Sequence, residues 1–446
     1  MPENIDRARK SAVFIDVGSL SIKFARYDIG TNGKGYISKV AERSGHVVQQ
    51  GRVSRPAAFH RMVQEIGAGA DSVVMVVASP SMRVDYIEPS PIEFGGGHEI
   101  QQEHIEELER RARHRLRKKH PGFDVLSLTP RLYRVDDREE GVHPLGMVAQ
   151  KLSIQFMGVL LPRQELLNYR NALQSHPQLQ IQDFGEAYRE ALTEEEVREG
   201  VAVVDIGHQL TKVVVYQGEG KAYMQVIPLG GVNIIQDVSR AFELPSKVAE
   251  KLVKDKGRAE RVAGPIVFVG GREQNTRAWR VSEEQLTTVI EARIEEILSM
   301  VKQAIARSSV DVLPYGIYLT GGVAHLKDID EKSGDVLGKA VKVMPLKSSL
   351  SGVLAAVSQR EELAFSLLDA CIGAVEASPE TVDVFSTADT ASTQAGPVPE
   401  EEAEEPNDVD PEENKAPSRM QKIFWRFLAM LFGVQKPAPQ SDVRKP

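Results

Sequence analysis

One pattern occurs twice in this chain, and it constrains the fold more than any other feature. Residues 16–23 read DVGSLSIK and residues 205–212 read DIGHQLTK, so both keep Asp first, Gly two positions later and Lys seven positions later. Each copy follows a short apolar run, at 12–15 or 201–204, and continues in apolar residues to a tyrosine eleven positions after the Asp. Two β-hairpins of one design predict two related lobes.

The rest of residues 11–375 alternates between short β-branched runs and helical periodicity. The runs at 72–78 and 317–319 predict buried strands, as do those before the two hairpins. Apolar residues recur at helical spacing over 282–306, where Ser282 offers an N-cap. The alternation predicts an α/β body. A chain of 446 residues, 41% hydrophobic and 26% charged, predicts two or three globular domains and excludes collagen-like and multi-span membrane classes.

Three lesser patterns carry weaker signals. Residues 103–119 predict a helix that begins with acids and ends with bases, which matches the helix dipole. We interpret its basic end as a solvated face and expect no nucleic-acid partner. Residues 94–97 are expected to form a loop. His98 and His104 lie six positions apart, on different faces of a helix, so a metal site is not expected there.

A strand that ends in Asp-x-Gly and turns back suits phosphate binding. Gly18 and Gly207 let the backbone approach a phosphate and present N–H groups to it. The hydroxyl groups that could add donors are those of Ser19, Ser21 and Thr211. Asp16 and Asp205 would face a phosphate only through a hydrated Mg²⁺, which takes one or two carboxylates and keeps its waters. An Asp-Gly pair can also simply end a strand in a turn, but two such copies favour phosphate.

A third element, at 316–326, reads GIYLTGGVAHL and predicts a buried strand, a Gly-Gly turn and a helix. Gly321 and Gly322 would let a flat base or ribose lie against bare backbone. A tight turn between strand and helix is the alternative interpretation.

Together the three elements resemble the actin-like ATPase superfamily, which includes actin, sugar kinases and heat-shock chaperones. Residues 16–23 look like its first phosphate motif, 205–212 its second, and 319–324 its adenosine motif. The resemblance implies an α/β, actin-like two-lobed ATPase fold of duplicated ribonuclease-H-like domains, with ATP and Mg²⁺ clamped between the lobes. The residues implied to bind nucleotide are Gly18, Ser19, Ser21, Lys23, Gly207, Thr211, Glu250, Gly321 and Gly322. Asp16 and Asp205 are implied to hold Mg²⁺ through water, with Asp205 catalytic because it would orient the attacking water.

Within the superfamily, the chain is similar to the FtsA family of bacterial cell-division proteins over roughly residues 11–375. The blocks that carry this similarity are 192–207, 226–257, 289–298, 126–130 and 141–147. The last two look like the family's inserted subdomain IC. The subdomains implied are IA at 11–84, 161–200 and 353–377, IC at 85–160, IIA at 201–242 and 306–352, and IIB at 243–305.

The chain departs from the family pattern at two places. The second hairpin usually reads Asp-Ile-Gly-Gly-Gly-Thr, but here 208–210 read His-Gln-Leu, and the added side chains predict slow hydrolysis at most. The ribose-contacting helix usually has Glu and then Lys three positions on. Here Val253 follows Glu250 at that spacing and Lys254 comes one position later, so a 100° shift is expected to turn its ammonium away.

The C-terminal part differs in composition from the body. Residues 378–417 contain twelve acids, one base and six prolines, and predict a disordered, extended acidic linker. Residues 418–434 predict an amphipathic helix, too short to span a bilayer but suited to anionic membrane lipids. Its membrane-contacting residues are expected to be Ile423, Phe424, Trp425, Phe427, Leu428, Leu431, Phe432, Lys422 and Arg426.

These expectations combine into one functional hypothesis. The chain would be an ATP-binding actin-like scaffold of the divisome, peripheral on the cytoplasmic face of the inner membrane at the septum. A single cysteine, Cys371, fits a reducing cytoplasm. The resemblance implies that FtsZ is recruited through IIB, that copies of the chain polymerise, and that IC contacts other division proteins. Two alternatives stay open, namely a PilM-like pilus-assembly platform and a small-molecule kinase of the same fold.

Overall fold

The computed structural model describes residues 10–29, 35–44, 47–67, 69–140, 143–173, 179–189, 192–270 and 278–343. The chain divides into two units, Met1–Phe385 and Ser386–Pro446, and every described residue belongs to the first. The predicted acidic linker and the predicted amphipathic helix lie outside the described residues. Among the helices that are described, none is long and apolar enough to cross a membrane.

The N-terminal hairpin belongs to a five-stranded sheet of order β12-β6-β1-β2-β3. Its strands are β1 (Lys10–Val17), β2 (Ser21–Ile29), β3 (Gly35–Ser44), β6 (Ser72–Val77) and β12 (Leu179–Asp183). β1, β2 and β3 pair antiparallel, whereas β6 runs parallel to both β1 and β12. Helices α1 (Pro56–Gly67) and α3 (Arg163–Ala172) pack with this sheet around a shared apolar core.

A second five-stranded sheet repeats this topology, in the order β19-β18-β13-β14-β15. Its strands are β13 (Val201–Ile206), β14 (Thr211–Gln217), β15 (Gly220–Ile227), β18 (Ile317–Thr320) and β19 (Val341–Val343). The antiparallel hairpin again comes first, and two parallel strands follow it. The predicted duplication of one sheet design is therefore confirmed in the strand order itself.

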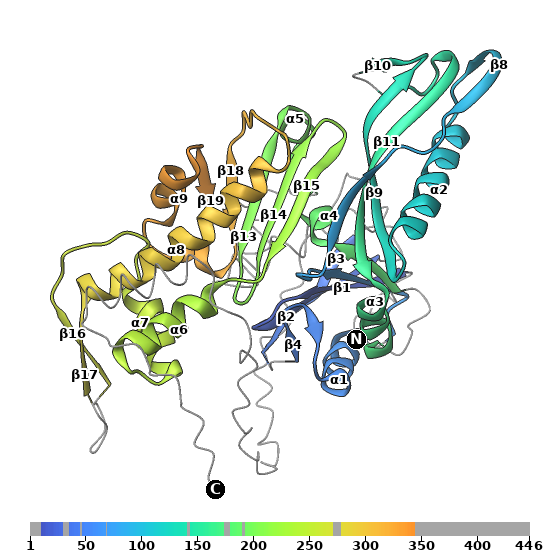
Figure 1. Ribbon diagram of the computed structural model, residues 1–446. Coiled ribbons are helices and arrows are strands. Elements are labelled where there is room, and N and C mark those ends of the chain that lie inside the picture. Colours follow the sequence, from blue (N-terminus) through green and yellow to red (C-terminus); the bar gives the residue numbers. More distant parts are fainter. Residues whose placement is uncertain are drawn as a thin grey trace, which may run out of the picture. The chain divides into compact units, whose positions relative to one another are not determined.

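A third sheet is inserted between β6 and β12. It has the order β10-β9-β11-β7, and β8 also pairs with β11. The strands are β7 (Arg83–Ile87), β8 (Ile92–Glu99), β9 (Phe123–Val135), β10 (Arg138–Glu140) and β11 (Val148–Pro162). Helix α2 (Gln102–Lys119) lies along the sheet and buries Ile105, Leu108, Ala112 and Leu116 against it (Figure 1).

The remaining helices cover the second sheet and its approaches. Helix α8 (Glu283–Ala306) contacts β14, β15 and α6 (Gly231–Phe242), and α6 packs on α7 (Ser246–Lys256). The predicted apolar face of α8 is confirmed, since Leu286, Val289, Ile290, Ile294, Ile297, Leu298 and Val301 are fully buried. The shorter elements are α4 (Phe184–Arg189), α5 (Glu194–Glu199), η1 (Gly322–His325), α9 (Ile329–Leu337), β4 (Val48–Gln49), β5 (Arg52–Val53), β16 (Ile266–Gly270) and β17 (Ala278–Ser282).

Two local expectations are wrong, and a third is met in part. Residues 94–97 belong to β8 instead of a loop, because β8 pairs with β11 on either side of a register shift. Ser282 occupies the N-cap of α8, but its side chain makes no capping hydrogen bond. His98 and His104 do not share a helix as expected, since His98 lies in β8 and His104 in α2, and their rings pack edge to face with centroids 5.5 Å apart.

A buried ion cluster joins elements from all three sheets. Lys221 on β15 donates to Asp183 at 2.8 Å, to Glu186 at 2.5 Å and to Ser127 on β9 at 2.9 Å. Lys221 is 3% exposed and Asp183 is fully buried. Burial alone would lower the pKa of Lys221, but the carboxylates of Asp183 and Glu186 raise it above the ordinary value. Lys221 therefore stays charged, and its hydrogen bonds fix β15 against α4 and the inserted sheet.

Candidate functional site

Both repeated hairpins place an aspartate and a lysine directly opposite each other. In the antiparallel register, Asp16 on β1 faces Lys23 on β2, and Asp205 on β13 faces Lys212 on β14. Directly opposed residues of an antiparallel pair project on the same side of the sheet, so each hairpin presents a carboxylate beside an ammonium group. Asp16 and Asp205 are both buried, at 8% exposure each.

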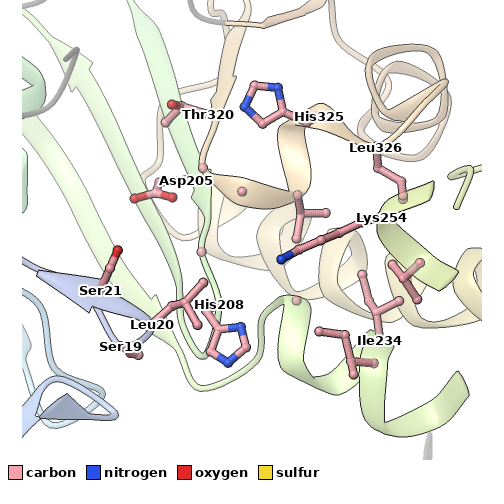
Figure 2. Close-up of a pocket in the computed structure, with 18 of the residues that line it drawn as sticks. Ser19, Leu20, Ser21, Asp205, His208, Ile234, Lys254, Thr320, His325 and Leu326 are labelled. Atoms are coloured by element: carbon pink, nitrogen blue, oxygen red, sulfur yellow. The ribbon is translucent and has the colours of Figure 1, made fainter. Parts of the chain in front are cut away.

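The two hairpins open onto one cavity of about 380 Å³ (Figure 2). The first hairpin contributes Asp16, Gly18, Ser19, Leu20, Ser21 and Lys23, and the second contributes Asp205, Gly207, His208 and Lys212. Tyr188 of α4, the start of α6, the end of α7, and the turn between β18 and α9 complete the wall. The three motifs singled out in the sequence thus converge on a single cavity.

Asp205 is held by two donors inside this cavity. Lys212 Nζ lies 2.8 Å from Asp205 Oδ2, and the Tyr188 hydroxyl donates to the same oxygen. Burial alone would raise the pKa of Asp205, but Lys212 and Tyr188 together hold it below the ordinary value. Burial alone would lower the pKa of Lys212, and the Asp205 charge keeps it above the ordinary value. The pair is therefore ionised near neutral pH.

The hairpin glycines are needed for the turns themselves. A Cβ on Gly18 would lie 2.5 Å from the Ser21 carbonyl oxygen, and one on Gly207 would lie 3.1 Å from the Leu210 carbonyl oxygen. The N–H of Gly207 already donates to the Leu210 carbonyl at 2.9 Å, and that of Gly18 donates to Asp16 at 3.2 Å. The expectation that these two N–H groups face a phosphate is therefore not met, since both are used within their turns.

Gly321 and Gly322 differ in what they do. Gly321 has a φ of +92°, and a Cβ there would lie 2.2 Å from Asp205 Oδ1. Gly322 has nothing within 4 Å of its Cβ position and faces the cavity. Gly321 therefore sets the close packing of β18 on the Asp205 carboxylate, while Gly322 leaves the flat, open backbone expected beside a base.

Helix α7 forms the opposite wall with Glu250, Val253, Lys254 and Asp255. Lys254 extends across the cavity (Figure 2) and its Nζ lies 2.7 Å from Glu250 Oε1. The expectation that a one-residue shift turns this ammonium away is wrong, because residues four apart lie on one face of a helix. The i, i+4 pair brings Lys254 back to the same wall as Glu250.

One expected site residue does not reach the cavity. Thr211 is fully buried, and its hydroxyl donates to the Leu229 carbonyl at 2.9 Å. Side chains alternate across a strand, so when Lys212 projects into the cavity its neighbour Thr211 must project to the other face. Thr211 therefore stabilises the connection to α6 and is not a phosphate ligand.

The structure adds residues that the sequence patterns did not single out. Tyr188, His325 and Lys327 line the cavity from α4 and from the turn after β18. Gln209 accepts a hydrogen bond from the Gln50 N–H at 2.7 Å, which links the second hairpin to the turn after β4. The lysine seven positions after the Asp of both hairpins was the available signal for Lys212. No sequence pattern pointed to Tyr188, since its contact with Asp205 exists only once α4 packs beside β13.

The donor set at the second hairpin does not fit the Mg²⁺ ion that the superfamily implies. Mg²⁺ takes near-octahedral oxygen ligands, but Asp205 Oδ2 already accepts from the ammonium of Lys212 and from Tyr188. Over the ranges that the structure describes, no group of three or more His, Cys, Asp or Glu side chains could hold a metal ion. A cation at Asp205 would have to displace a buried lysine.

Comparison with known proteins agrees with this geometry. The family model "Cell division protein FtsA" matches residues 202–358, and the model "SHS2 domain inserted in FTSA" matches residues 89–160. FtsA of Bacillus subtilis strain 168 is 28% identical over 229 residues, which cover 49% of this chain and 51% of that protein. FtsA of Staphylococcus epidermidis strain RP62A is 24% identical over 345 residues, covering 74% and 73%. The match thus spans about half the length of the Bacillus relative.

A solved structure, the PilM-PilN type IV pilus biogenesis complex, superposes with a TM-score of 0.56. It is 17% identical and covers 81% of this chain and 96% of that chain. Two sheets of one topology with a cavity at their paired hairpins define an actin-like ATPase fold, and this likeness agrees with it. The SHS2 insert distinguishes families within that fold. The chain belongs to the FtsA family of cell-division proteins.

Proposed function

We propose that this chain binds ATP in the cavity between its two hairpins and acts as a nucleotide-dependent scaffold in cell division. The observation that carries the proposal is the convergence of both Asp–Lys hairpins and the Gly321–Gly322 turn on one cavity of about 380 Å³. That volume falls in the range of small-molecule sites. Lysines supply charge for phosphates, and a flat glycine turn offers space for a base.

The binding roles follow from where each side chain lies. Lys23, Ser19 and Ser21 would bind phosphate oxygens from the first hairpin, with Lys212 opposite them on the second. Glu250 on α7 would contact the ribose, and the base would lie against Gly322. Because these residues come from both sheets, bound nucleotide would favour the arrangement in which both hairpins contact it.

The scaffold part of the proposal rests on family membership and on the C-terminal sequence. We infer that residues 418–434 bind anionic lipid on the cytoplasmic face of the inner membrane, with 378–417 as a linker. FtsZ would be recruited through residues 243–305, and further division proteins or neighbouring copies would contact the inserted sheet at 85–160. Polymerisation of the chain on the membrane completes this proposal.

A PilM-like platform is the second candidate, because the PilM-PilN complex shares the fold at a TM-score of 0.56. The SHS2 insert and the amphipathic C-terminal sequence favour the FtsA-like role. A small-molecule kinase would need a general base in the cavity. Asp205, whose carboxylate is held by Lys212 and Tyr188, is a poor one.

The nucleotide site is tested by two exposed leucines of matched accessibility. Leu20 is 39% exposed and lines the cavity, whereas Leu167 is 40% exposed on α3, away from it. Leu20→Glu adds a carboxylate beside the phosphates, and we expect the affinity for a fluorescent ATP analogue to fall at least about tenfold. Leu167→Glu should leave it unchanged. Equal affinities for the two variants and the unmodified chain would show that ATP does not bind in this cavity.

A further inference from the structure

We propose that Lys212 takes the place of a divalent cation at the second hairpin, so that this chain binds nucleotide without Mg²⁺. The inference rests on the proposed function, because it concerns the form in which nucleotide enters the same cavity. It also assigns Lys212 as the residue that decides the metal requirement.

Lys212 contacts both Asp205 and Tyr188 in the wall of the cavity. Its Nζ lies 2.8 Å from Asp205 Oδ2 and 3.4 Å from the Tyr188 hydroxyl. The side chains of Lys212 and Asp205 are only 13% and 12% exposed. The Asp16 carboxylate of the first hairpin also acts to raise the pKa of Lys212. One buried ammonium group thus pairs with Asp205 and is stabilised by the charge of Asp16, the two aspartates that were expected to hold the cation.

A metal ion could bind Asp205 only by displacing Lys212, and this displacement would be energetically unfavourable. A metal ion at Asp205 would leave a buried ammonium without its carboxylate, next to a second positive charge. Breaking a buried ion pair by removing one partner is strongly unfavourable, because the remaining charge is uncompensated. The Tyr188 hydroxyl, which donates to the same carboxylate oxygen, must also find another acceptor. Mg²⁺, which gives up its waters reluctantly, has little to gain from this exchange.

Positive and negative side chains are equal in number in the wall of the cavity. Four lysines line it, Lys23, Lys212, Lys254 and Lys327, together with the carboxylates of Asp16, Asp205, Glu250 and Asp255. Lys254 pairs with Glu250, and Lys212 pairs with Asp205. Asp205 and Glu250 are thereby paired within the protein, and the four lysines match the four carboxylates in charge, so a triphosphate without metal meets no net negative wall. Lys23 adds an ammonium at the equivalent place on the first hairpin.

The same arrangement limits chemistry at Asp205. A general base must accept a proton from water within hydrogen-bond reach. One carboxylate oxygen of Asp205 already accepts two donors, and the other packs on the turn at Gly321. Asp205 is therefore a positioning group for Lys212, and the nucleotide acts as a ligand that selects a conformation.

The test measures the affinity of the full chain for a fluorescent ATP analogue in excess Mg²⁺ and in EDTA. For the unmodified chain we expect dissociation constants within about threefold of each other. Lys212→Ala should bind at least about tenfold more weakly in EDTA, and Mg²⁺ should recover part of that loss, because Asp205 is then open to a cation. Lys327→Ala is the control, because it removes a lysine of the cavity wall that lies opposite neither hairpin aspartate, and it should weaken binding equally in both buffers.

The outcomes separate this inference from the proposed function. Binding by the unmodified chain that is lost more than about tenfold in EDTA overturns the role of Lys212 but leaves the ATP site in place. Absence of binding in both buffers overturns the ATP site and the inference with it. The comparison of buffers needs no variant, so it stands even if Lys212→Ala fails to fold.

Discussion

At the scale of single residues, the two glycines of the turn after β18 offer a sharp contrast. Gly321 has a φ of +92° and its Cβ would clash with Asp205 and with the Ile206 carbonyl, whereas a Cβ on Gly322 meets nothing within 4 Å. We expect Gly321→Ala to lower the free energy of unfolding by about 2 kcal/mol and to abolish ATP binding. Gly322→Ala should change stability by less than about 0.5 kcal/mol.

Chemical denaturation and ATP titration of both variants measure this contrast. Gly322→Ala is the informative partner, because it keeps the fold but adds a methyl group where we place the base. A modest loss of affinity with normal stability supports that placement. If Gly321→Ala were as stable as the unmodified chain, the close packing of the turn on Asp205 would be wrong.

At the scale of secondary-structure elements, the buried cluster around Lys221 determines how β15 meets α4 and the inserted sheet. Lys221→Met leaves Asp183, which is fully buried, without its cation. We expect the free energy of unfolding to fall by about 3–5 kcal/mol. Lys151→Met, which removes a surface pair with an Asp137 side chain that is 72% exposed, should cost less than about 1 kcal/mol. Equal losses for the two variants would argue against the buried cluster.

The difference in free energy of unfolding between the unmodified chain and Lys221→Met should decrease at high pH. The pKa of Lys221 is raised in the folded state, since Asp183 and Glu186 outweigh the effect of burial. A raised pKa contributes stability that is complete below the ordinary lysine value of 10.5 and is lost as the pH rises through the folded-state value. The gap between the unmodified chain and Lys221→Met should therefore stay constant from pH 7 to 9 and narrow at pH 11. Urea unfolding at the three pH values measures it.

Many of the helices and strands could be predicted from the sequence alone, because short β-branched runs and helical periodicity are local signals. The strands before both hairpins and the apolar face of α8 follow directly from them. Residues 94–97 could not be placed, since this glycine run becomes part of a strand only when the residues on both sides of it pair with β11. Thr211 was misassigned for a related reason. The face of β14 that lines the cavity is the one that carries Lys212, because Lys212 lies opposite Asp205 in the hairpin. The contact between Tyr188 and Asp205 also joins separate elements, so no local pattern predicts it.

At the scale of the whole molecule, the nucleotide site and the C-terminal sequence must be tested together. Residues 378–417 carry a charge of −11 and residues 418–446 carry +5, while the rest of the chain is close to neutral. Cationic, apolar sequence after an acidic, proline-rich stretch favours binding to anionic lipid. We expect the full chain to co-sediment with vesicles containing phosphatidylglycerol, and a chain ending at Ala377 to remain in the supernatant.

Trp425→Glu should release the full chain from the same vesicles, because it places a charge on the apolar face of the helix predicted at 418–434. The control variant Trp425→Phe keeps this face apolar and should stay bound. ATP should increase the sedimented fraction of the full chain if nucleotide favours assembly on the lipid surface, since each added contact between copies raises avidity. The Leu20→Glu variant separates the two effects. It should still bind vesicles without ATP and should lose only the ATP-dependent increase. Co-sedimentation of the chain ending at Ala377 at the level of the full chain would place the lipid contact elsewhere in the molecule.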